Sequence, residues 1–109
     1  WQPEHCAALL AELGYPASIG RVATGDWFAV RGERAAWLRD TFSPLLVEME
    51  GGAIAQVCLR NGVRFAAVKS VSDHLFSDNQ AQEYFDFGEA LERLGKIVLP
   101  LALKLKEEA

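Results

Sequence analysis

The sequence predicts an α/β fold, in which short strands alternate with helices, and three observations support this prediction. The 109 residues suffice for one domain, residues 1–109, with a modest core. Half of the residues are hydrophobic and 24% are charged, which is a globular composition. Stretches of helical periodicity are separated by short apolar runs that begin and end near Gly or Pro. Three expected strands and four expected helices make half of a three-layer α/β/α sandwich, with sheet faces and edges left uncovered.

The first part of the chain is expected to form a helix and then a strand. Residues 3–13 have Pro in the first turn and Gly14 at the end, as helices do, and their apolar side chains recur at helical spacing. After the Tyr-Pro turn at 15–16, residues 18–24 alternate apolar with small side chains. We expect a strand there that ends at Gly25.

The middle of the chain repeats this order of elements. Residues 32–42 are expected to be helical, and their buried side would carry four apolar side chains: Ala35, Trp37, Leu38 and Phe42. Residues 45–47, a Leu-Leu-Val run between Pro and Glu, fit a short buried strand. Residues 49–61 are expected to form the next helix, which the Asn-Gly pair at 61–62 ends. Its apolar face would contain Met49, Ala53, Ile54, Val57 and Cys58.

The last third is expected to contain a central strand, a loop and a long helix. Residues 63–71 are rich in Val, Phe and Ala, as buried strands are. A polar loop follows at 77–82. Residues 87–106 carry a helical seam of Leu and Val side chains, in which Pro100 should cause a kink.

Composition excludes several classes of function. Eleven Lys and Arg against fifteen Asp and Glu give a net charge of −4, and no segment carries a basic stripe, so we expect no nucleic-acid partner. The apolar runs are far shorter than the ~20 residues of a membrane span. The two His and the two Cys are not at metal-ligand spacing, so we expect no metal and no cofactor. Cys6 and Cys58 have apolar neighbours and are expected to be buried free thiols, which fits a cytoplasmic location.

Two acidic segments follow expected strands, where open α/β sheets usually place their ligands. Residues 47–53 read Val-Glu-Met-Glu-Gly-Gly-Ala, and residues 68–73 read Val-Lys-Ser-Val-Ser-Asp. A carboxylate at a helix or turn N-terminus is also explained by capping alone, so spacing leaves both interpretations open for Glu48, Glu50 and Asp73. Residues 25–28 read Gly-Asp-Trp-Phe, and two adjacent aromatic residues ordinarily belong to a core.

Taken together, these three segments resemble one family. Gly-Asp-x-Phe at 25–28, Val-Glu-Met-Glu at 47–50 and Ser-Asp at 72–73 resemble the C-terminal half of the nucleoside phosphorylase/nucleosidase superfamily, and within it the 5′-methylthioadenosine/S-adenosylhomocysteine nucleosidases. A single Ser-Asp pair has no specificity, whereas the three motifs in this order are specific. The resemblance extends from about residue 20 to the terminal helix. It implies a three-layer α/β/α phosphorylase/hydrolase-like fold, of which this chain is the C-terminal half.

The resemblance also implies a reaction, the hydrolysis of the N-glycosidic bond of a purine nucleoside to adenine and a thioribose. Asp73 would be the catalytic acid that protonates N7 of the departing base, as a carboxyl group can when burial keeps its proton in place near neutrality. Ser72 would orient Asp73. Glu50 would accept hydrogen bonds from the 2′- and 3′-hydroxyls and stabilise the cationic sugar of the transition state.

The remaining roles that the resemblance implies concern the base, the sugar and support for the acid. Phe28 would stack on the adenine, and the main chain at Phe28 and Ala29 would contact the edge of the base. Met49 would pack against the sugar. Lys69 would support the acid without touching the substrate, and we interpret Glu48 as structural.

Several alternatives stay open at this point. Ser-Asp-His at 72–74 also occurs in hexameric purine nucleoside phosphorylases, so phosphorolysis remains an alternative, as does a futalosine-type hydrolase. A non-catalytic remnant that binds nucleosides is a third. The chain begins at Trp1 without Met, like the middle of a longer chain, and the family's N-terminal half carries the Glu that activates the water. We therefore expect these 109 residues alone to be inactive, and to form a homodimer through residues 27–30 or to pair with the N-terminal half.

Overall fold

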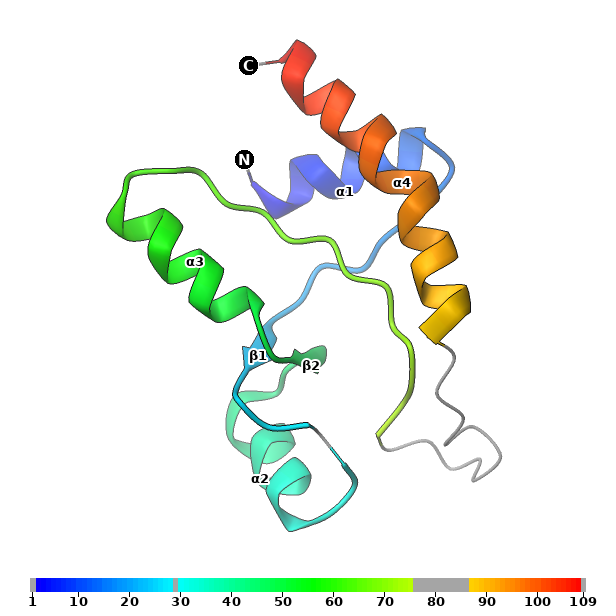
Figure 1. The fold of residues 1–109 in the computed structure, drawn as a ribbon. Helices are drawn as coiled ribbons and strands as arrows, with labels where there is room; N and C mark the ends of the chain where they lie inside the picture. Colours follow the sequence, from blue (N-terminus) through cyan, green and yellow to red (C-terminus); the bar gives the residue numbers. More distant parts are fainter. Residues whose placement is uncertain (1, 29, 76–86, 109) are drawn as a thin grey trace. The chain divides into compact units, whose positions relative to one another are not determined.

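The structure, a computed structural model, describes residues 2–28, 30–75 and 87–108, which fall into two compact units (Figure 1). The helical unit contains residues 2–19, 68–72 and 87–108. The sheet unit contains residues 20–28, 30–67 and 73–75. Helices and strands alternate along the chain, which confirms the α/β class.

The helical unit is built on two helices, α1 (Pro3–Glu12) and α4 (Phe87–Glu107). Pro3 begins α1, and the chain leaves it through Gly14, whose φ of 86° lies in the left-handed region that favours glycine. The two helices share a core of Leu9, Leu10 and Leu101, which are 3 to 7% exposed. Around this core pack the half-buried side chains of Leu13, Val68, Ile97 and Leu105. Apolar burial therefore holds α1 against α4.

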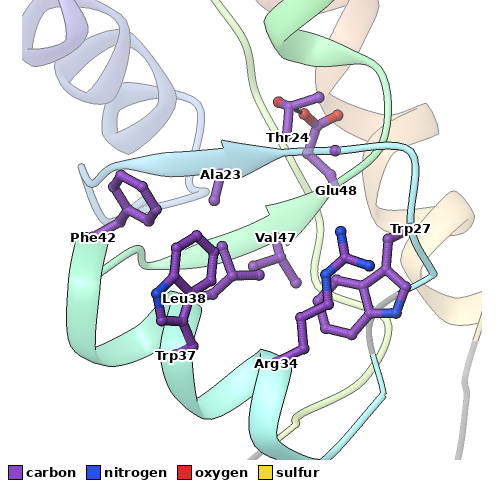
Figure 2. A pocket seen from close by; sticks show the side chains of 10 residues that line it. Ala23, Thr24, Trp27, Arg34, Trp37, Leu38, Phe42, Val47 and Glu48 are labelled. Atoms are coloured by element: carbon purple, nitrogen blue, oxygen red, sulfur yellow. Dashed lines mark hydrogen bonds between the residues drawn. The ribbon is translucent and has the colours of Figure 1, made fainter.

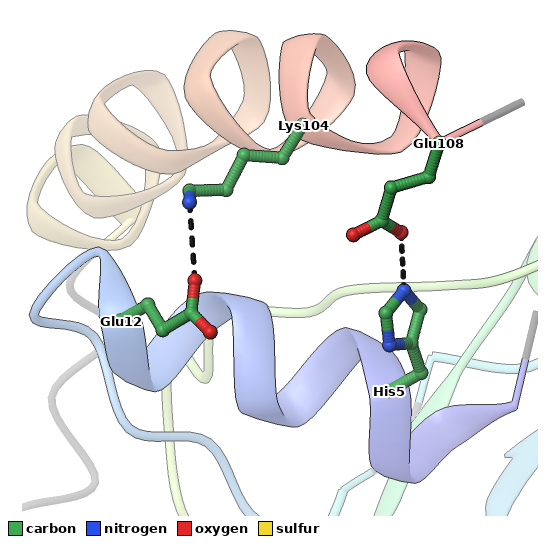
Figure 3. A network of polar contacts seen from close by, with 4 residues as sticks. All are labelled: His5, Glu12, Lys104 and Glu108. Carbon is green, nitrogen blue, oxygen red and sulfur yellow. Dashed lines mark hydrogen bonds and ion pairs between the residues drawn. The ribbon is translucent and has the colours of Figure 1, made fainter.

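Two polar contacts between exposed side chains also join α1 to α4 (Figure 3). Lys104 Nζ lies 3.1 Å from Glu12 Oε2, and His5 Nε2 pairs with the carboxylate of Glu108. All four side chains are substantially exposed to solvent. Exposed pairs contribute ~0–1 kcal/mol, whereas one fully buried Leu contributes ~1.5–3 kcal/mol. The leucine core thus contributes more to the stability of this unit than its ion pairs do.

The sheet unit contains a two-stranded parallel sheet in its described residues. β1 (Val22–Thr24) pairs with β2 (Leu46–Glu48), so that Ala23 lies opposite Val47. α2 (Glu33–Phe42) forms the crossover that parallel strands require. α3 (Gly51–Arg60) follows β2 and packs against β1 (Figure 1). The carboxyl ends of both strands therefore meet at the start of α3.

Burial in the sheet unit is less extensive than the sequence predicts. Ala35 on α2 is 3% exposed, but Trp37 and Phe42 are 55% and 42% exposed, so the predicted buried side of α2 is wrong for these two. α3 has no buried residue, and Ile54 and Val57 are more than half exposed, so its predicted apolar face is not buried here. The reason is physical: a periodic apolar face is buried only where another element covers it. Cys6 and Cys58 are free thiols as predicted, but Cys58 is only half-buried.

The predicted strand at 63–71 is also wrong, because these residues form no strand in the structure. They follow α3 as a chain without regular secondary structure (Figure 1). A strand exists only through hydrogen bonds to a neighbouring strand, and residues 63–71 have no such neighbour in the described part of the chain. The four helices agree with their predicted ranges to within three residues at each end, and α4 continues through Pro100. The predicted loop at 77–82 lies outside the described residues.

Candidate functional site

Glu48 is the last residue of β2, and its carboxylate binds the beginning of α3. The backbone N–H of Gly51 donates to both carboxylate oxygens, at 2.9 and 2.7 Å, and the N–H of Glu50 donates at 3.0 Å. The first N–H groups of a helix have no acceptor inside the helix, and a carboxylate there is also stabilised by the helix dipole. The structural interpretation of Glu48 is therefore confirmed, since its carboxylate caps α3.

Thr24, the last residue of β1, joins the same network. Its hydroxyl donates to the Glu48 carboxylate and accepts from the N–H of Gly52 at 2.9 Å. A Cβ on Gly52 would lie 2.9 Å from the Cβ of Thr24, so this close approach requires glycine. Sequence reasoning missed Thr24. Its place at the end of an expected strand, opposite an acidic strand end, is the signal that could have revealed it.

Glu50 and Met49 occupy the turn between β2 and α3. Glu50 is the N-cap residue of α3, yet its side chain makes no capping hydrogen bond. Its side chain is exposed, and that of Met49 is 40% exposed. The capping interpretation is therefore wrong for Glu50, because Glu48 performs that role. The helix leaves the Glu50 carboxylate, with its two acceptor oxygens, at the carboxyl edge of the parallel sheet.

The Gly-Asp-Trp-Phe segment leaves β1 at the same edge. The N–H of Gly25 donates to the carbonyl oxygen of Glu48 at 3.1 Å, which places the start of this segment beside β2. Phe28 is 61% exposed, so the expectation that it belongs to a core is wrong. Trp27 is half-buried, and the guanidinium carbon of Arg34 lies 4.6 Å from its ring centroid. Ala29 lies outside the described residues.

A cavity of about 250 Å³ lies between α2 and the sheet (Figure 2). Aromatic and aliphatic side chains from α2, from both strands and from the segment after β1 line most of it: Ala23, Trp27, Trp37, Leu38, Phe42 and Val47. Phe28, Met49 and Glu50 are not among its lining residues. Thr24, Gly25 and Glu48 also line the cavity, so it reaches the carboxyl ends of both strands, where the acidic turn begins.

The second acidic segment continues from the helical unit into the sheet unit. Lys69 and Ser72 belong to the helical unit, and Asp73 is grouped with the sheet unit, as are Phe28, Met49 and Glu50. Ser72 and Asp73 are half-buried, whereas Lys69 is exposed. The sheet unit thus contains the candidate acid together with the candidate sugar and base contacts that the structure describes.

Other ionisable groups do not gather around this edge as a metal site. Among residues 2–28, 30–75 and 87–108, no three His, Cys, Asp or Glu side chains lie close enough together to hold a metal ion. Nor does any helix in the described ranges combine the length and apolarity needed to cross a bilayer.

On α2, the hydrogen bond from Arg39 at 2.8 Å lowers the pKa of the Asp40 carboxyl group and raises the pKa of Arg39.

Comparison with known proteins links these segments to a family. A family model described as "Phosphorylase superfamily" matches residues 4–103. Three curated relatives are each named "5'-methylthioadenosine/S-adenosylhomocysteine nucleosidase". The relative from Geobacillus thermodenitrificans is 44% identical over 61 residues, 55% of this chain and 26% of the relative. The relative from Shewanella halifaxensis is 36% identical over 88 residues, 79% of this chain and 36% of the relative.

The third relative, from Geobacillus kaustophilus, is 33% identical over 97 residues. That match covers 87% of this chain and 41% of the relative. The chain therefore spans about a quarter to two-fifths of the length of the curated relatives that it matches. No solved structure matches the chain.

Proposed function

Because the chain belongs to the phosphorylase superfamily, we propose that the polypeptide carrying it is a purine nucleosidase, an N-glycosyl hydrolase. Its substrates are 5′-methylthioadenosine and S-adenosylhomocysteine, and its products are adenine and a thioribose. The printed names of the three relatives support this reaction and these substrates. The sequence contributes the C-terminal part of a three-layer α/β/α domain.

The observation that carries the proposal is the different use of two neighbouring carboxylates. Glu48 is occupied by three backbone N–H contacts at the start of α3, whereas Glu50 makes no capping bond and is exposed. In the proposed site Glu50 accepts hydrogen bonds from the 2′- and 3′-hydroxyls of the ribose. As the bond to the base breaks, positive charge develops on the sugar, and a fixed carboxylate stabilises that charge.

Asp73 is the proposed general acid, and it gives its proton to N7 of the departing purine. Protonation neutralises the charge that the base acquires, and general acid catalysis of this kind is worth roughly 10²–10⁴ in rate. Ser72 orients the Asp73 carboxyl group, and Lys69 supports this carboxyl group without touching the substrate. The half-buried position of Asp73 supports a role at the border between solvent and site.

Phe28, Ala29 and Met49 complete the proposed site by holding the substrate. Phe28 stacks on the face of the adenine, and its 61% exposure supports this role because a core aromatic would not be accessible. The main chain at Phe28 and Ala29 contacts the base edge. Met49 packs against the sugar beside Glu50. No cofactor or metal takes part in this reaction scheme.

A second candidate reaction is phosphorolysis, and Ser-Asp-His at 72–74 favours it. In that case phosphate replaces water as the nucleophile, while Asp73 and Glu50 keep their roles. A futalosine-type hydrolase would use the same base and sugar contacts to cleave a different nucleoside. A non-catalytic protein would use them to bind a nucleoside without cleaving it.

The proposal also covers the cellular location, the assembly and the activity of these residues alone. The two free thiols support a cytoplasmic location, and we propose a homodimer with residues 27–30 at its interface. The 109 residues contain no group to which the resemblance assigns activation of water. We therefore propose that they are inactive alone.

The experiment measures adenine release from 5′-methylthioadenosine by the full polypeptide that carries this sequence, with and without phosphate. Release in phosphate-free buffer is the expected result. Release that depends on phosphate would replace the hydrolase by a phosphorylase. Binding of the nucleoside without any release would overturn the enzymatic proposal and leave the binding function.

A further inference from the structure

Arg93, on the second turn of α4, reaches across to the chain segment that leads into Ser72 and Asp73. Its Nε donates to Ser70 Oγ at 2.9 Å, and its Nη2 donates to the carbonyl oxygen of Val71 at 2.8 Å. Its Nη1 lies 3.0 Å from Glu89 Oε1 on the preceding turn of the same helix. All three nitrogens of one guanidinium group are therefore in contact with defined partners.

These contacts lie where regular backbone pairing is missing. Residues 63–71 have no strand partner in the part of the chain that the structure describes, so their backbone groups are not held by a ladder. The Val71 carbonyl receives a charged donor from Arg93 instead, and charge-assisted hydrogen bonds are stronger than neutral ones. Val71 is two residues before Asp73. Fixing its carbonyl fixes the peptide plane from which the Ser-Asp pair begins.

We propose that Arg93 is a positioning residue for the general acid. By binding Ser70 and Val71, it fixes the backbone from which Ser72 and Asp73 continue, and this limits the directions in which the Asp73 carboxyl group can point. This inference rests on the proposed function, because it requires Asp73 to act as an acid. It assigns a function to a residue that lies outside the three motifs of the resemblance.

The chemistry of the side chain explains why arginine suits this position. The guanidinium group is planar and rigid, so two of its nitrogens contact adjacent residues of one segment while the third is held by Glu89. A lysine has a single charged nitrogen at the end of a flexible stem. Arg93→Lys would keep the positive charge and lose the fixed fork, so it separates the effect of geometry from that of charge.

The same helix provides a matched control. Lys96 Nζ lies 3.2 Å from Glu92 Oε1, an i,i+4 ion pair three residues along the helix from that of Arg93 and Glu89. Both cations are about half exposed. Lys96 pairs within its own helix, whereas Arg93 also holds the segment before Asp73. Lys96→Ala therefore removes an equivalent ion pair without touching that segment.

The test measures kcat and KM of the full polypeptide on two substrates, 5′-methylthioadenosine and a nitrophenyl riboside. The purine needs a proton to depart, whereas nitrophenolate departs without one, so a general acid matters only for the first. We expect Arg93→Ala to lower kcat on the nucleoside by about 10- to 100-fold with KM changed less than about threefold, since a misplacement of ~1 Å costs ~10²-fold. On the nitrophenyl riboside its kcat should fall by less than about threefold.

Three companion variants complete the design. Arg93→Lys should have a kcat between that of Arg93→Ala and that of the parent. Ser70→Ala, which removes one contact, should lower kcat on the nucleoside alone, and by less than Arg93→Ala does. Lys96→Ala should match the parent on both substrates. If Arg93→Ala does not fold, the Lys and Ser70 variants provide the same comparison.

The outcomes separate this inference from the proposed function. Asp73→Asn should lose kcat on the nucleoside alone, and an Asp73→Asn enzyme of unchanged turnover would overturn both proposals. A loss for Asp73→Asn together with unchanged kinetics for the Arg93 variants would overturn the positioning role and leave the proposed function standing. Equal losses on both substrates for Arg93→Ala would likewise reduce Arg93 to a structural role.

Discussion

Different forces stabilise the helical unit and the sheet unit. Among the described residues, the helical unit contains five buried hydrophobic residues: Cys6, Leu9, Leu10, Ala90 and Leu101. The sheet unit contains one, Ala35, and depends instead on a polar network in which Glu48 and Thr24 bind backbone N–H groups at the start of α3. Apolar burial is non-directional, whereas hydrogen bonds specify orientation. Four candidate site residues, Phe28, Met49, Glu50 and Asp73, thus lie in the unit whose contacts fix the direction of individual groups.

This difference explains why the acidic turn stays accessible. Burying a carboxylate without partners costs several kcal/mol, so a carboxylate with no partner is expected at the surface. At the carboxyl edge of the sheet, Glu48 takes the capping bonds and Glu50 does not. Glu48 therefore caps α3, and the carboxylate of Glu50 stays exposed to solvent.

The largest effect on stability is expected in the leucine core. Leu10 is 3% exposed, so Leu10→Ala should lower the free energy of unfolding by about 2–5 kcal/mol, through lost burial and the cavity left behind. Leu103→Ala on α4, at a position 51% exposed, is the matched control and should change it by less than about 0.5 kcal/mol. Urea unfolding followed by circular dichroism measures both. Equal losses would mean that this core does not dominate the helical unit.

The polar network of the sheet unit should give the next largest effect. Glu48→Ala leaves the first N–H groups of α3 without their acceptor and should lower the free energy of unfolding by about 1–3 kcal/mol. Glu50→Gln should leave stability within about 0.5 kcal/mol of the parent while lowering nucleoside turnover. Unfolding curves and adenine release on the same two variants test this. Stability losses of similar size would contradict the division of roles between these carboxylates.

Removing an exposed ion pair of the helical unit should change the free energy of unfolding much less. Lys104→Gln removes the pair with Glu12, whose side chain is 62% exposed, and should cost at most about 1 kcal/mol. The loss should shrink further in 1 M salt, which screens exposed charges. Unfolding midpoints at low and high salt measure it. A loss as large as that of Glu48→Ala would remove the contrast between the polar contacts of the two units.

The smallest effect concerns the exposed pair on α2. The hydrogen bond from Arg39 lowers the pKa of Asp40 from its ordinary value of 3.8, so the pair stabilises the folded state above pH 3.8. That contribution is lost as the pH falls through the lowered pKa. Asp40→Asn should therefore be slightly less stable than the parent at pH 6, with the difference vanishing at the acid end. Arg39→Gln is the control, and a difference that grows on acidification would contradict the assigned direction.

The sequence predicted the helices well because their signals are local. Pro3 and Gly14 bracket α1, and Asn61 and Gly62 follow α3, so caps and periodicity suffice to find both helices. The strand expected at 63–71 was wrong because a strand needs a partner, and partner choice is not a local property. Similarly, the apolar face of α3 was evident from its spacing, but spacing does not say which element covers it.

In the candidate site, too, some residues could be found from the sequence and others only from the structure. The motifs around Phe28, Glu50 and Asp73 could be found from residue types and order alone, and the resemblance they carry agrees with the matched family. The sequence favoured a structural role for Glu48 but left capping open for Glu50 as well. The bonds of Thr24 to Glu48 and Gly52 join residues 24 and 28 positions apart, so only its place at a strand end hinted at its role. The sequence could not reveal Arg93, which binds Ser70 and Val71 across 23 and 22 positions.

By itself, then, the sequence determined the α/β class, the four helices, the family and the chemical identity of the candidate groups. These follow from periodicity, capping and short motifs, all of which act between residues near one another in the chain. Only the tertiary structure decided which of two adjacent carboxylates caps α3 and which stays exposed, and which distant side chain holds the segment before Asp73. Those choices depend on hydrogen bonds between segments that folding brings together, and such bonds leave no periodic trace in the sequence.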